Sequence, residues 1–249
     1  METNSGKNFR DSLIIDRYST EFKHWRGLKL EHLKSENSED AITWNVFRSL
    51  KQIDPKSWLP NIFVETFQKE FGYKLDFIDI HLWRKLNPSS NYKTPEGTSE
   101  IDIIIESDEF VWIIEAKYKS DISMSTTHDV NRNQVIRNID VGLEYVNERD
   151  FYFSLLILDG KHSSKGVAVT NEYKHSINRI MDELPHRNHE LSKLLGIGIL
   201  TWDNFLELFD EISNNTNNEL ERVIAGSAYS WLNGKINIKT RKHNNGVKM

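Results

Sequence analysis

Residues 100–118, EIDIIIESDEFVWIIEAKY, contain the clearest structural pattern in the chain. Two runs rich in isoleucine, valine and aromatic residues, 100–106 and 110–118, lie on either side of a short polar SDE segment. β-Branched and aromatic residues favour strands, and a polar segment between two such runs is typical of a hairpin turn. The stretch therefore predicts two antiparallel strands joined by a tight connection.

Three polar side chains are expected to gather on one face of this hairpin. Side chains alternate along a strand, so Glu115 and Lys117 point to the same face and Ala116 points to the other. If the turn is centred between the aspartate and the glutamate of the SDE segment, Asp102 lies directly opposite Glu115, with β-carbons roughly 5 Å apart. Two carboxylates and one ammonium group are thus predicted to converge.

This predicted cluster has the chemistry of a metal site. Two carboxylates at that separation repel each other unless a cation lies between them. Mg²⁺, for which Mn²⁺ can substitute, takes oxygen ligands and keeps several waters. Such an ion polarises a phosphate and lowers the pKa of an attacking water, while Lys117 balances charge in the transition state. The pattern favours phosphodiester hydrolysis, and the alternative is an ordinary hairpin with exposed acids and a cross-strand Lys–Glu pair.

The sequence on both sides of the hairpin predicts further helices and strands. Ser38 can cap a helix over 39–50, whose first turn is acidic as the helix dipole favours. The other expected elements are a helix over 62–71, a strand over 75–86, a loop over 87–98, a helix over 130–147, a strand over 151–158, a helix over 172–195 broken near Pro185, a strand over 197–202 and a helix over 203–212. Together they predict an α/β fold with a mixed central β-sheet flanked by helices.

The spacing of the polar hairpin residues resembles a known family motif. Asp102, twelve intervening residues and then Glu115-Ala116-Lys117 are similar to the PD-(D/E)XK motif of restriction-endonuclease-like nucleases. The resemblance extends over 38–202 and implies the αβββαβ core of that family. It also implies that Mg²⁺ is held by Asp102, Glu115 and Ala116, and that Lys117 is catalytic.

The same resemblance implies a division of the chain into three parts. These are an N-terminal helical arm over 1–37, a PD-(D/E)XK nuclease core over 38–213, and a C-terminal helix with a basic tail over 214–249. One departure from the family pattern is that Ile101, and not proline, precedes Asp102.

The resemblance implies two further catalytic residues. The family often places a glutamate on its first core helix, turned toward the metal, and Glu39 is the best match, with Asp40 second. The helix after the motif often carries a glutamine, and Gln134 fits that place, on one helix face with Arg137 and Asn138. The alternatives are plain stabilisation of a helix dipole by the two acids and an ordinary solvated face on the later helix.

Charge is unevenly distributed along the chain. The formal net charge is −5, yet residues 223–249 contain no acidic residue and several lysines and arginines. A basic end on an acidic chain is compatible with DNA binding through a local patch, and the alternative is a solvated tail. The residues expected to contact DNA are Arg137, Lys161, Lys165, Lys239, Arg241 and Lys242.

These features predict a metal-dependent DNA endonuclease acting in restriction, phage defence or a mobile element. The alternatives are a repair or recombination nuclease on branched or single-stranded DNA, and a non-catalytic module for nucleic-acid binding or assembly. The absence of cysteine excludes disulfides and thiolate nucleophiles and fits a cytoplasmic protein. No stretch predicts a signal peptide or a membrane segment. A homodimer stays open, because many members of the family cut DNA as dimers.

Overall fold

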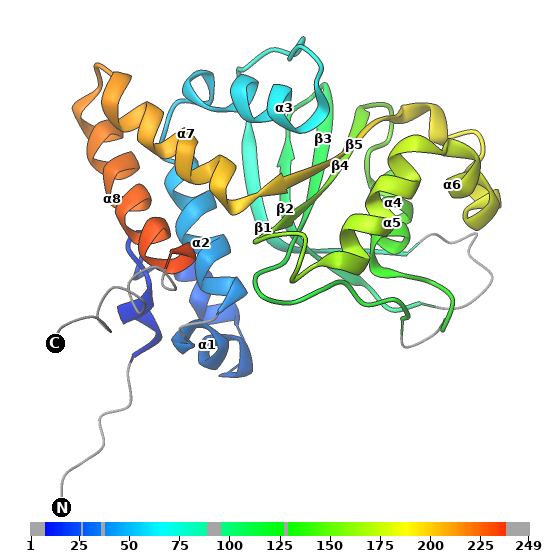
Figure 1. Cartoon of the computed structure of the whole chain (residues 1–249), viewed down its shortest axis with the longest axis horizontal. Helices are drawn as coiled ribbons and strands as arrows, with labels where there is room; N and C mark the ends of the chain where they lie inside the picture. Colours follow the sequence, from blue (N-terminus) through cyan, green and yellow to red (C-terminus); the bar gives the residue numbers. More distant parts are fainter. Residues whose placement is uncertain (1–7, 26, 36–37, 89–95, 127–128, 238–249) are drawn as a thin grey trace, which may run out of the picture. The chain divides into compact units, whose positions relative to one another are not determined.

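The structure, a computed structural model, describes residues 8–25, 27–35, 38–88, 96–126 and 129–237 (Figure 1). The chain divides into two compact units. One combines the two ends of the chain, Met1–Trp58 and Asp203–Met249, and the other is the central segment Leu59–Trp202. The boundaries predicted near residues 38 and 213 both fall inside the first unit. Among the described helices, none has the length and apolar character needed to cross a membrane.

The first unit is helical in its described parts. Its elements are the 3-10 turns η1 (Phe9–Ser12), η2 (Thr20–His24) and η3 (Pro55–Ser57) and the helices α1 (Gly27–Lys34), α2 (Glu39–Leu50), α7 (Trp202–Asn215) and α8 (Glu219–Ile236). The predicted cap of α2 is confirmed, because the Ser38 hydroxyl accepts a hydrogen bond from the Ala41 amide at 3.0 Å. Phe47 of α2 is fully buried and packs on Phe205 of α7, with ring centroids 5.2 Å apart. The two ends of the chain therefore share one core.

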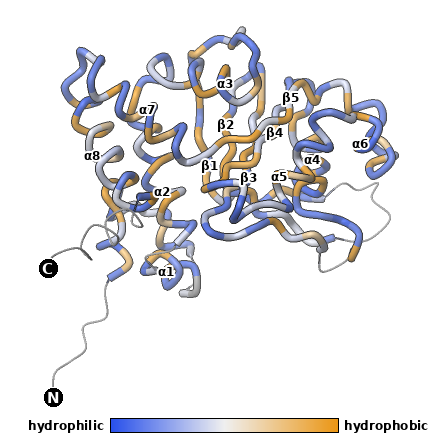
Figure 2. The backbone as a smooth tube through the Cα atoms, in the orientation of Figure 1, coloured by the Kyte–Doolittle hydropathy of each residue, from blue (hydrophilic) through white to orange (hydrophobic). Residues whose placement is uncertain are grey.

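The second unit is built on a five-stranded sheet whose strands β3 and β4 are strongly hydrophobic (Figure 2). The strands lie in the order β1 (Asp79–Leu86), β2 (Ser99–Glu106), β3 (Phe110–Ala116), β4 (Asp150–Ile157) and β5 (Leu194–Thr201). β2 is antiparallel to both of its neighbours, β1 and β3, whereas β3, β4 and β5 run parallel to one another. The predicted α/β fold with a mixed central sheet is therefore confirmed.

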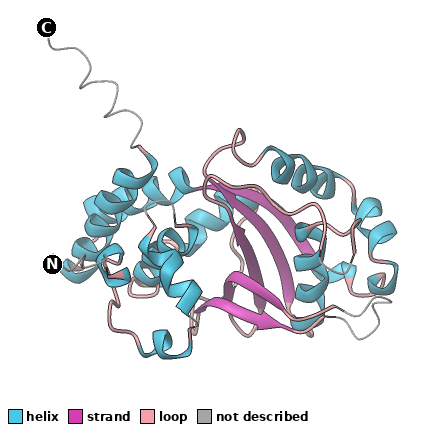
Figure 3. Ribbon diagram, turned by 90° about the horizontal axis from the view of Figure 1, so that it is seen from below, coloured by secondary structure: helices cyan, strands magenta, loops and turns pink. Residues whose placement is uncertain are grey.

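Helices cover both faces of this sheet, because its central strands are apolar on both sides (Figure 3). One face carries α3 (Leu59–Phe67), and the other carries α4 (Gln134–Tyr145), α5 (Ser164–His175) and α6 (Ile177–Glu183). On the first face, Phe67 packs on Trp112 of β3, with ring centroids 5.1 Å apart. On the second, a β-carbon added at Gly142 of α4 would overlap the Phe151 ring, so glycine is what lets α4 approach β4.

The helix predicted over 172–195 is wrong at both ends. The helical region begins earlier, with α5 at Ser164, and the chain already enters β5 at Leu194. Between α5 and β5 lie α6 and the 3-10 turns η4 (Pro185–Arg187) and η5 (Leu191–Lys193). The first turns of α5 contain Gly166, where a β-carbon would lie 2.8 Å from the Leu155 side chain. Close packing on the sheet, and not helix propensity, therefore stabilises this part of α5.

The strand predicted over 75–86 is shorter in the structure. β1 begins at Asp79, because the chain turns at Phe77, whose φ of 61° is incompatible with an extended strand. No sequence pattern indicates this left-handed residue, since Phe77 itself favours strands.

A charged cluster joins β1, β2 and α4 at the end of β2 that is remote from Asp102. The Glu106 carboxylate contacts His81 and Arg149 at 2.8 Å and the Tyr145 hydroxyl at 2.9 Å. Burial raises the pKa of Glu106, but the hydrogen bonds from His81 and Arg149 outweigh it and lower the pKa to about 2. Glu106 is therefore ionised at neutral pH and links these elements.

Candidate active site

The β2–β3 hairpin adopts the predicted register, with its turn centred between Asp108 and Glu109. The last regular pair is Ile103 with Ile114. Continued by one residue beyond this last pair, the register sets Asp102 opposite Glu115 and assigns both carboxylates to the same face of the sheet. This is the face that carries α4.

The sheet opens at this point. In regular antiparallel pairing, the Ala116 amide would donate to the Ile101 carbonyl. It donates instead to Oδ2 of Asp102 at 2.9 Å, so a carboxylate replaces a backbone partner. On the other side of Asp102, the opposing residue of β1 is Trp83, whose φ of 53° is one that bulky residues seldom adopt. Backbone strain and an interrupted ladder both occur next to Asp102.

Glu115 is the most enclosed residue of this cluster. Its side chain is only 1% exposed and accepts hydrogen bonds from three side chains. Lys117 Nζ and Gln134 Nε2 both donate to Oε1 at 2.5 Å, and Asn138 Nδ2 donates to Oε2 at 2.6 Å. A buried carboxylate needs paired charge and hydrogen bonds, and these three donors supply both.

Helix α4 brings Gln134 and Asn138 to this carboxylate. The two residues are four positions apart, so they lie one above the other on a single face of the helix. Asn133 caps the helix, because its side chain accepts a hydrogen bond from the Ile136 amide at 3.0 Å. The first two turns of α4 are thereby fixed against the end of β3.

A buried ion cluster fixes α4 further along its length. The Asp140 carboxylate is fully buried and contacts Arg132 at 2.6 Å, Arg187 at 2.7 Å and His186 at 3.0 Å. Burial raises the pKa of Asp140, but Arg187 and Arg132 outweigh it and hold the pKa below its usual range. The cluster joins α4 to η4, and so it helps to position the two amides that contact Glu115.

Lys117 is held by both its backbone and its side chain. Its amide donates to the Leu156 carbonyl at 2.7 Å, and its carbonyl accepts a hydrogen bond from the Trp202 indole at 3.1 Å. The side chain is buried, and Nζ donates to the Ala116 carbonyl at 3.0 Å as well as to Glu115. The ammonium group thus touches two of the groups that the sequence assigns to a metal ion.

The donor set fits a hard divalent cation that has few protein ligands. Asp102 and Glu115 supply carboxylate oxygens and Ala116 supplies a carbonyl oxygen, which are ligand types that Mg²⁺ accepts. Within the described ranges, no three or more His, Cys, Asp or Glu residues form a group that could hold a metal ion. The protein would therefore leave several ligand positions to water, as is common for Mg²⁺. The Lys117 ammonium acts as a stand-in cation at two of these oxygens.

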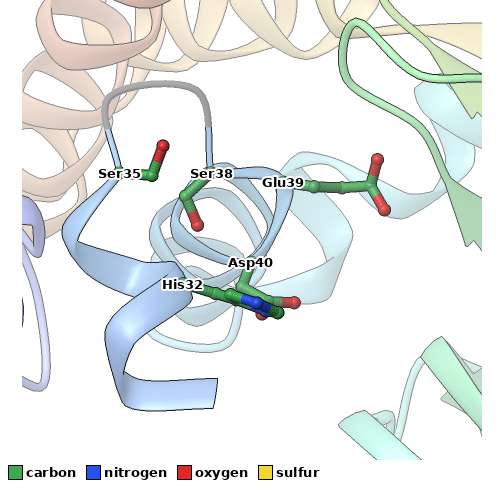
Figure 4. Close-up of a pocket in the computed structure, with 5 residues that line it drawn as sticks. All are labelled: His32, Ser35, Ser38, Glu39 and Asp40. Atoms are coloured by element: carbon green, nitrogen blue, oxygen red, sulfur yellow. The ribbon is translucent and has the colours of Figure 1, made fainter. Parts of the chain in front are cut away.

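Glu39 belongs to the first unit, where it begins α2 beside a cavity of about 270 Å³ (Figure 4). The cavity is lined by His32, Ser35, Ser38, Glu39 and Asp40. Asp40 lies 4.0 Å from Nδ1 of His32, whereas the Glu39 side chain points away from both. The assignment of Glu39, or of Asp40, to the metal stays a prediction.

Two of the lysines expected to contact DNA follow a strand that ends at the same edge of the sheet as β3. β3 and β4 are parallel, so the segments that follow them leave from the same edge of the sheet. Lys117 follows β3, and the exposed Lys161 and Lys165 follow β4. Lys165 lies in the first turn of α5, where its backbone amide donates to the Asp121 carboxylate at 2.9 Å.

The other residues expected to contact DNA are placed differently. Arg137 donates to the carbonyls of Gly97 and Thr98 at 3.1 and 3.3 Å, so it holds the segment that precedes β2. This contact gives Arg137 a structural role, and a role in DNA binding stays a prediction. Lys239, Arg241 and Lys242 lie outside the described residues.

Two residues of the cluster were missed by the sequence reasoning. Asn138 was expected only to share a helix face with Gln134, although its spacing of four residues is the signal that two amides reach one target. Trp83 was expected to be a regular strand residue, and no sequence signal indicates its left-handed backbone. Both residues flank the two acids.

The chain has no significant match among family models, curated proteins or solved structures. What the cluster does is therefore inferred from its own geometry and chemistry.

Proposed function

We propose that this chain is a metal-dependent DNA endonuclease of the PD-(D/E)XK type, which hydrolyses phosphodiester bonds. One observation carries the proposal: at the open end of the hairpin, the Asp102 carboxylate accepts the amide of Ala116, the residue next to Glu115, and the Lys117 ammonium contacts Glu115. Burying a carboxylate and an ammonium at the end of an apolar strand is costly, and such groups are concentrated at functional sites. In chain order, α3, the strands β1 to β3, α4 and β4 give an α-β-β-β-α-β succession, which supports the proposal. Its first helix is α3, and not the helix α2 over 39–50 that carries Glu39.

The two acids and Lys117 would have separate tasks. When held by Asp102, Glu115 and the Ala116 carbonyl, Mg²⁺ would polarise the scissile phosphate and lower the pKa of the attacking water. Lys117 would hold that water by a hydrogen bond and offset the negative charge that develops on the phosphate.

The two amides of α4 would orient the metal ligand. Gln134 and Asn138 each bind one oxygen of Glu115, so they restrict rotation of the carboxylate about its last bond. Substitution of a residue that holds a metal ligand in one orientation commonly lowers metal affinity or activity by about 10- to 100-fold.

DNA is the proposed substrate, because exposed lysines belong to the same sheet edge as Lys117. Lys161 and Lys165 follow β4 at that edge and can each neutralise a phosphate. A homodimer is proposed for double-strand cleavage, since the described part of one chain contains a single such cluster and each strand needs its own. Action on cytoplasmic DNA, in restriction, phage defence or a mobile element, accords with the lack of cysteine.

A second candidate is a non-catalytic module that binds nucleic acid or assists assembly. The observation that favours it is that Glu115 already has three hydrogen-bond donors from the chain itself. The cluster is therefore electrostatically satisfied without a metal ion, and a purely structural role is physically reasonable.

A cleavage assay separates the two candidates. Supercoiled, linear and single-stranded DNA are incubated with the protein in Mg²⁺, in Mn²⁺ and in EDTA. Nicked or linear products are expected only with metal, and Lys117→Ala is expected to lower the rate on the order of 10²–10³-fold. Lys174→Ala, an exposed lysine in the last turn of α5, is the control and should cut like the wild type. Absence of cutting in every condition would favour the non-catalytic module.

A further inference from the structure

The side chain of Lys117 lies where a metal ion would need its ligands. Of the three groups that fit a divalent cation, the Glu115 carboxylate and the Ala116 carbonyl both accept hydrogen bonds from Lys117 Nζ, at 2.5 and 3.0 Å. We propose that Lys117 is an internal competitor of the metal: its ammonium occupies these oxygens in the metal-free protein and sets the metal affinity. This inference rests on the proposed function and adds to it a regulatory role for Lys117.

The hydrogen-bonding capacity of Glu115 makes the competition direct. A carboxylate oxygen has two lone pairs, and Oε1 uses both of them, for Lys117 and for Gln134. Oε2 accepts the Asn138 amide. A metal ion that binds through Oε1 therefore has to displace a donor, and a cation and an ammonium cannot share one oxygen without strong repulsion.

Lys117 is the donor best suited to leave. Gln134 and Asn138 are neutral amides on a capped helix, so they do not repel a cation. Lysine has a flexible stem and a compact charge, and it can redirect its ammonium without backbone movement. Once displaced, the ammonium can form a hydrogen bond with the attacking water. Metal binding would therefore release Lys117 for its role in the reaction.

The first test measures metal affinity in the absence of DNA. Calorimetric titration with Mg²⁺ and with Mn²⁺ compares the wild type with Lys117→Met, which keeps the length of the side chain but removes its charge. The variant is expected to bind metal about tenfold or more tightly, as expected for release of a charged hydrogen bond. The matched control is Lys119→Met, which removes an exposed charge two residues away and should change the affinity by less than about twofold.

An unchanged or weaker affinity in Lys117→Met would overturn the competition. An equal gain in both variants would also overturn it, because general charge reduction would then account for the effect.

A second measurement uses the wild-type protein, so it does not depend on the folding of a variant. In isotopically labelled protein, the NMR signal of the Lys117 ammonium should shift in step with Mg²⁺ binding as its hydrogen bond to Glu115 is lost. A signal that stays unchanged while metal binds would contradict the competition. If the wild type binds metal and cuts DNA but Lys117→Met shows wild-type affinity, only the competition fails. If the wild type binds no metal, both proposals fail.

Discussion

Replacing Glu115 by glutamine should destabilise the metal-free protein, although it removes one of two neighbouring acids. From the sequence alone, repulsion between Asp102 and Glu115 is the dominant force, and its relief would raise stability. In the structure, the Lys117 ammonium contacts Glu115 at 2.5 Å and both side chains are buried. The lost attraction should therefore exceed the relieved repulsion.

The size of the effect follows from the contacts of Glu115. Removal of one partner from a buried ion pair costs about 3–5 kcal/mol, because the other charge is left without compensation. The new amide group of glutamine also faces the amide donors of Gln134 and Asn138, and a mismatched donor costs about 1 kcal/mol or more. Relief of repulsion from Asp102 offsets part of this sum. A net loss of about 3 kcal/mol is expected, which lowers the urea midpoint by roughly 1 M or more at ordinary m-values.

Urea unfolding in EDTA, followed by both fluorescence and far-UV circular dichroism, tests this value. Coincidence of the two signals shows whether a single transition describes a chain with two compact units. Asp102→Asn is the matched variant: Asp102 is partly exposed, and an amide oxygen can still accept the Ala116 amide, so its cost should stay below about 1 kcal/mol. Stability of Glu115→Gln equal to or above the wild type would refute the reasoning.

Three further outcomes are expected. Asn138→Leu removes the hydrogen bond to one oxygen of Glu115 and should lower the cleavage rate by about 10- to 100-fold. DNA affinity in a gel-shift assay should stay unchanged. A wild-type cleavage rate would show that Asn138 does not belong to the site. Asp140→Asn removes one carboxylate from two buried arginines, which keep their contacts with Glu96 and Glu144, and should lower stability by about 1–3 kcal/mol in urea unfolding. A change of less than about 0.5 kcal/mol, which is typical of surface substitutions, would contradict the cluster's role. The pKa of Glu106 is lowered from 4.5 to about 2, so its contribution to stability is fully present above pH about 4.5 and is lost as the pH falls toward 2. Glu106→Gln should remove this part of the pH dependence of the free energy of unfolding. A pH dependence identical to that of the wild type would show that the partners of Glu106 do not stabilise its carboxylate.

The register of the β2–β3 hairpin, from which Asp102 is placed opposite Glu115, could be predicted because it depends only on local rules. Alternation along two strands and a short symmetric turn fix which residues face each other, with no information from the rest of the chain. Gln134 was expected only through the family resemblance, and its contact with Glu115 accords with a helix after β3 that packs back on the sheet it leaves.

Contacts that depend on tertiary packing could not be predicted in the same way. The start of α5 is a region of poor helix formers that is held by the close approach of Gly166 to Leu155. The left-handed backbone of Trp83 depends on its neighbours in β1 and β2, and its sequence context is that of an ordinary strand. The pairing of Lys117 with Glu115 was foreseen only as a shared face, because side-chain rotamers depend on what surrounds them.

The mixed topology of the sheet explains why the polar cluster lies where it does. β3 is the strand at which the sheet changes from antiparallel to parallel pairing. On the parallel side, hydrogen bonding continues past the end of β3, through the Lys117 amide to the Leu156 carbonyl at 2.7 Å. On the antiparallel side, regular pairing has already stopped at Ile103 and Ile114. The last residues of β3 are therefore held on one side only, and the opening on the other side is what gives the Asp102 carboxylate access to the Ala116 amide.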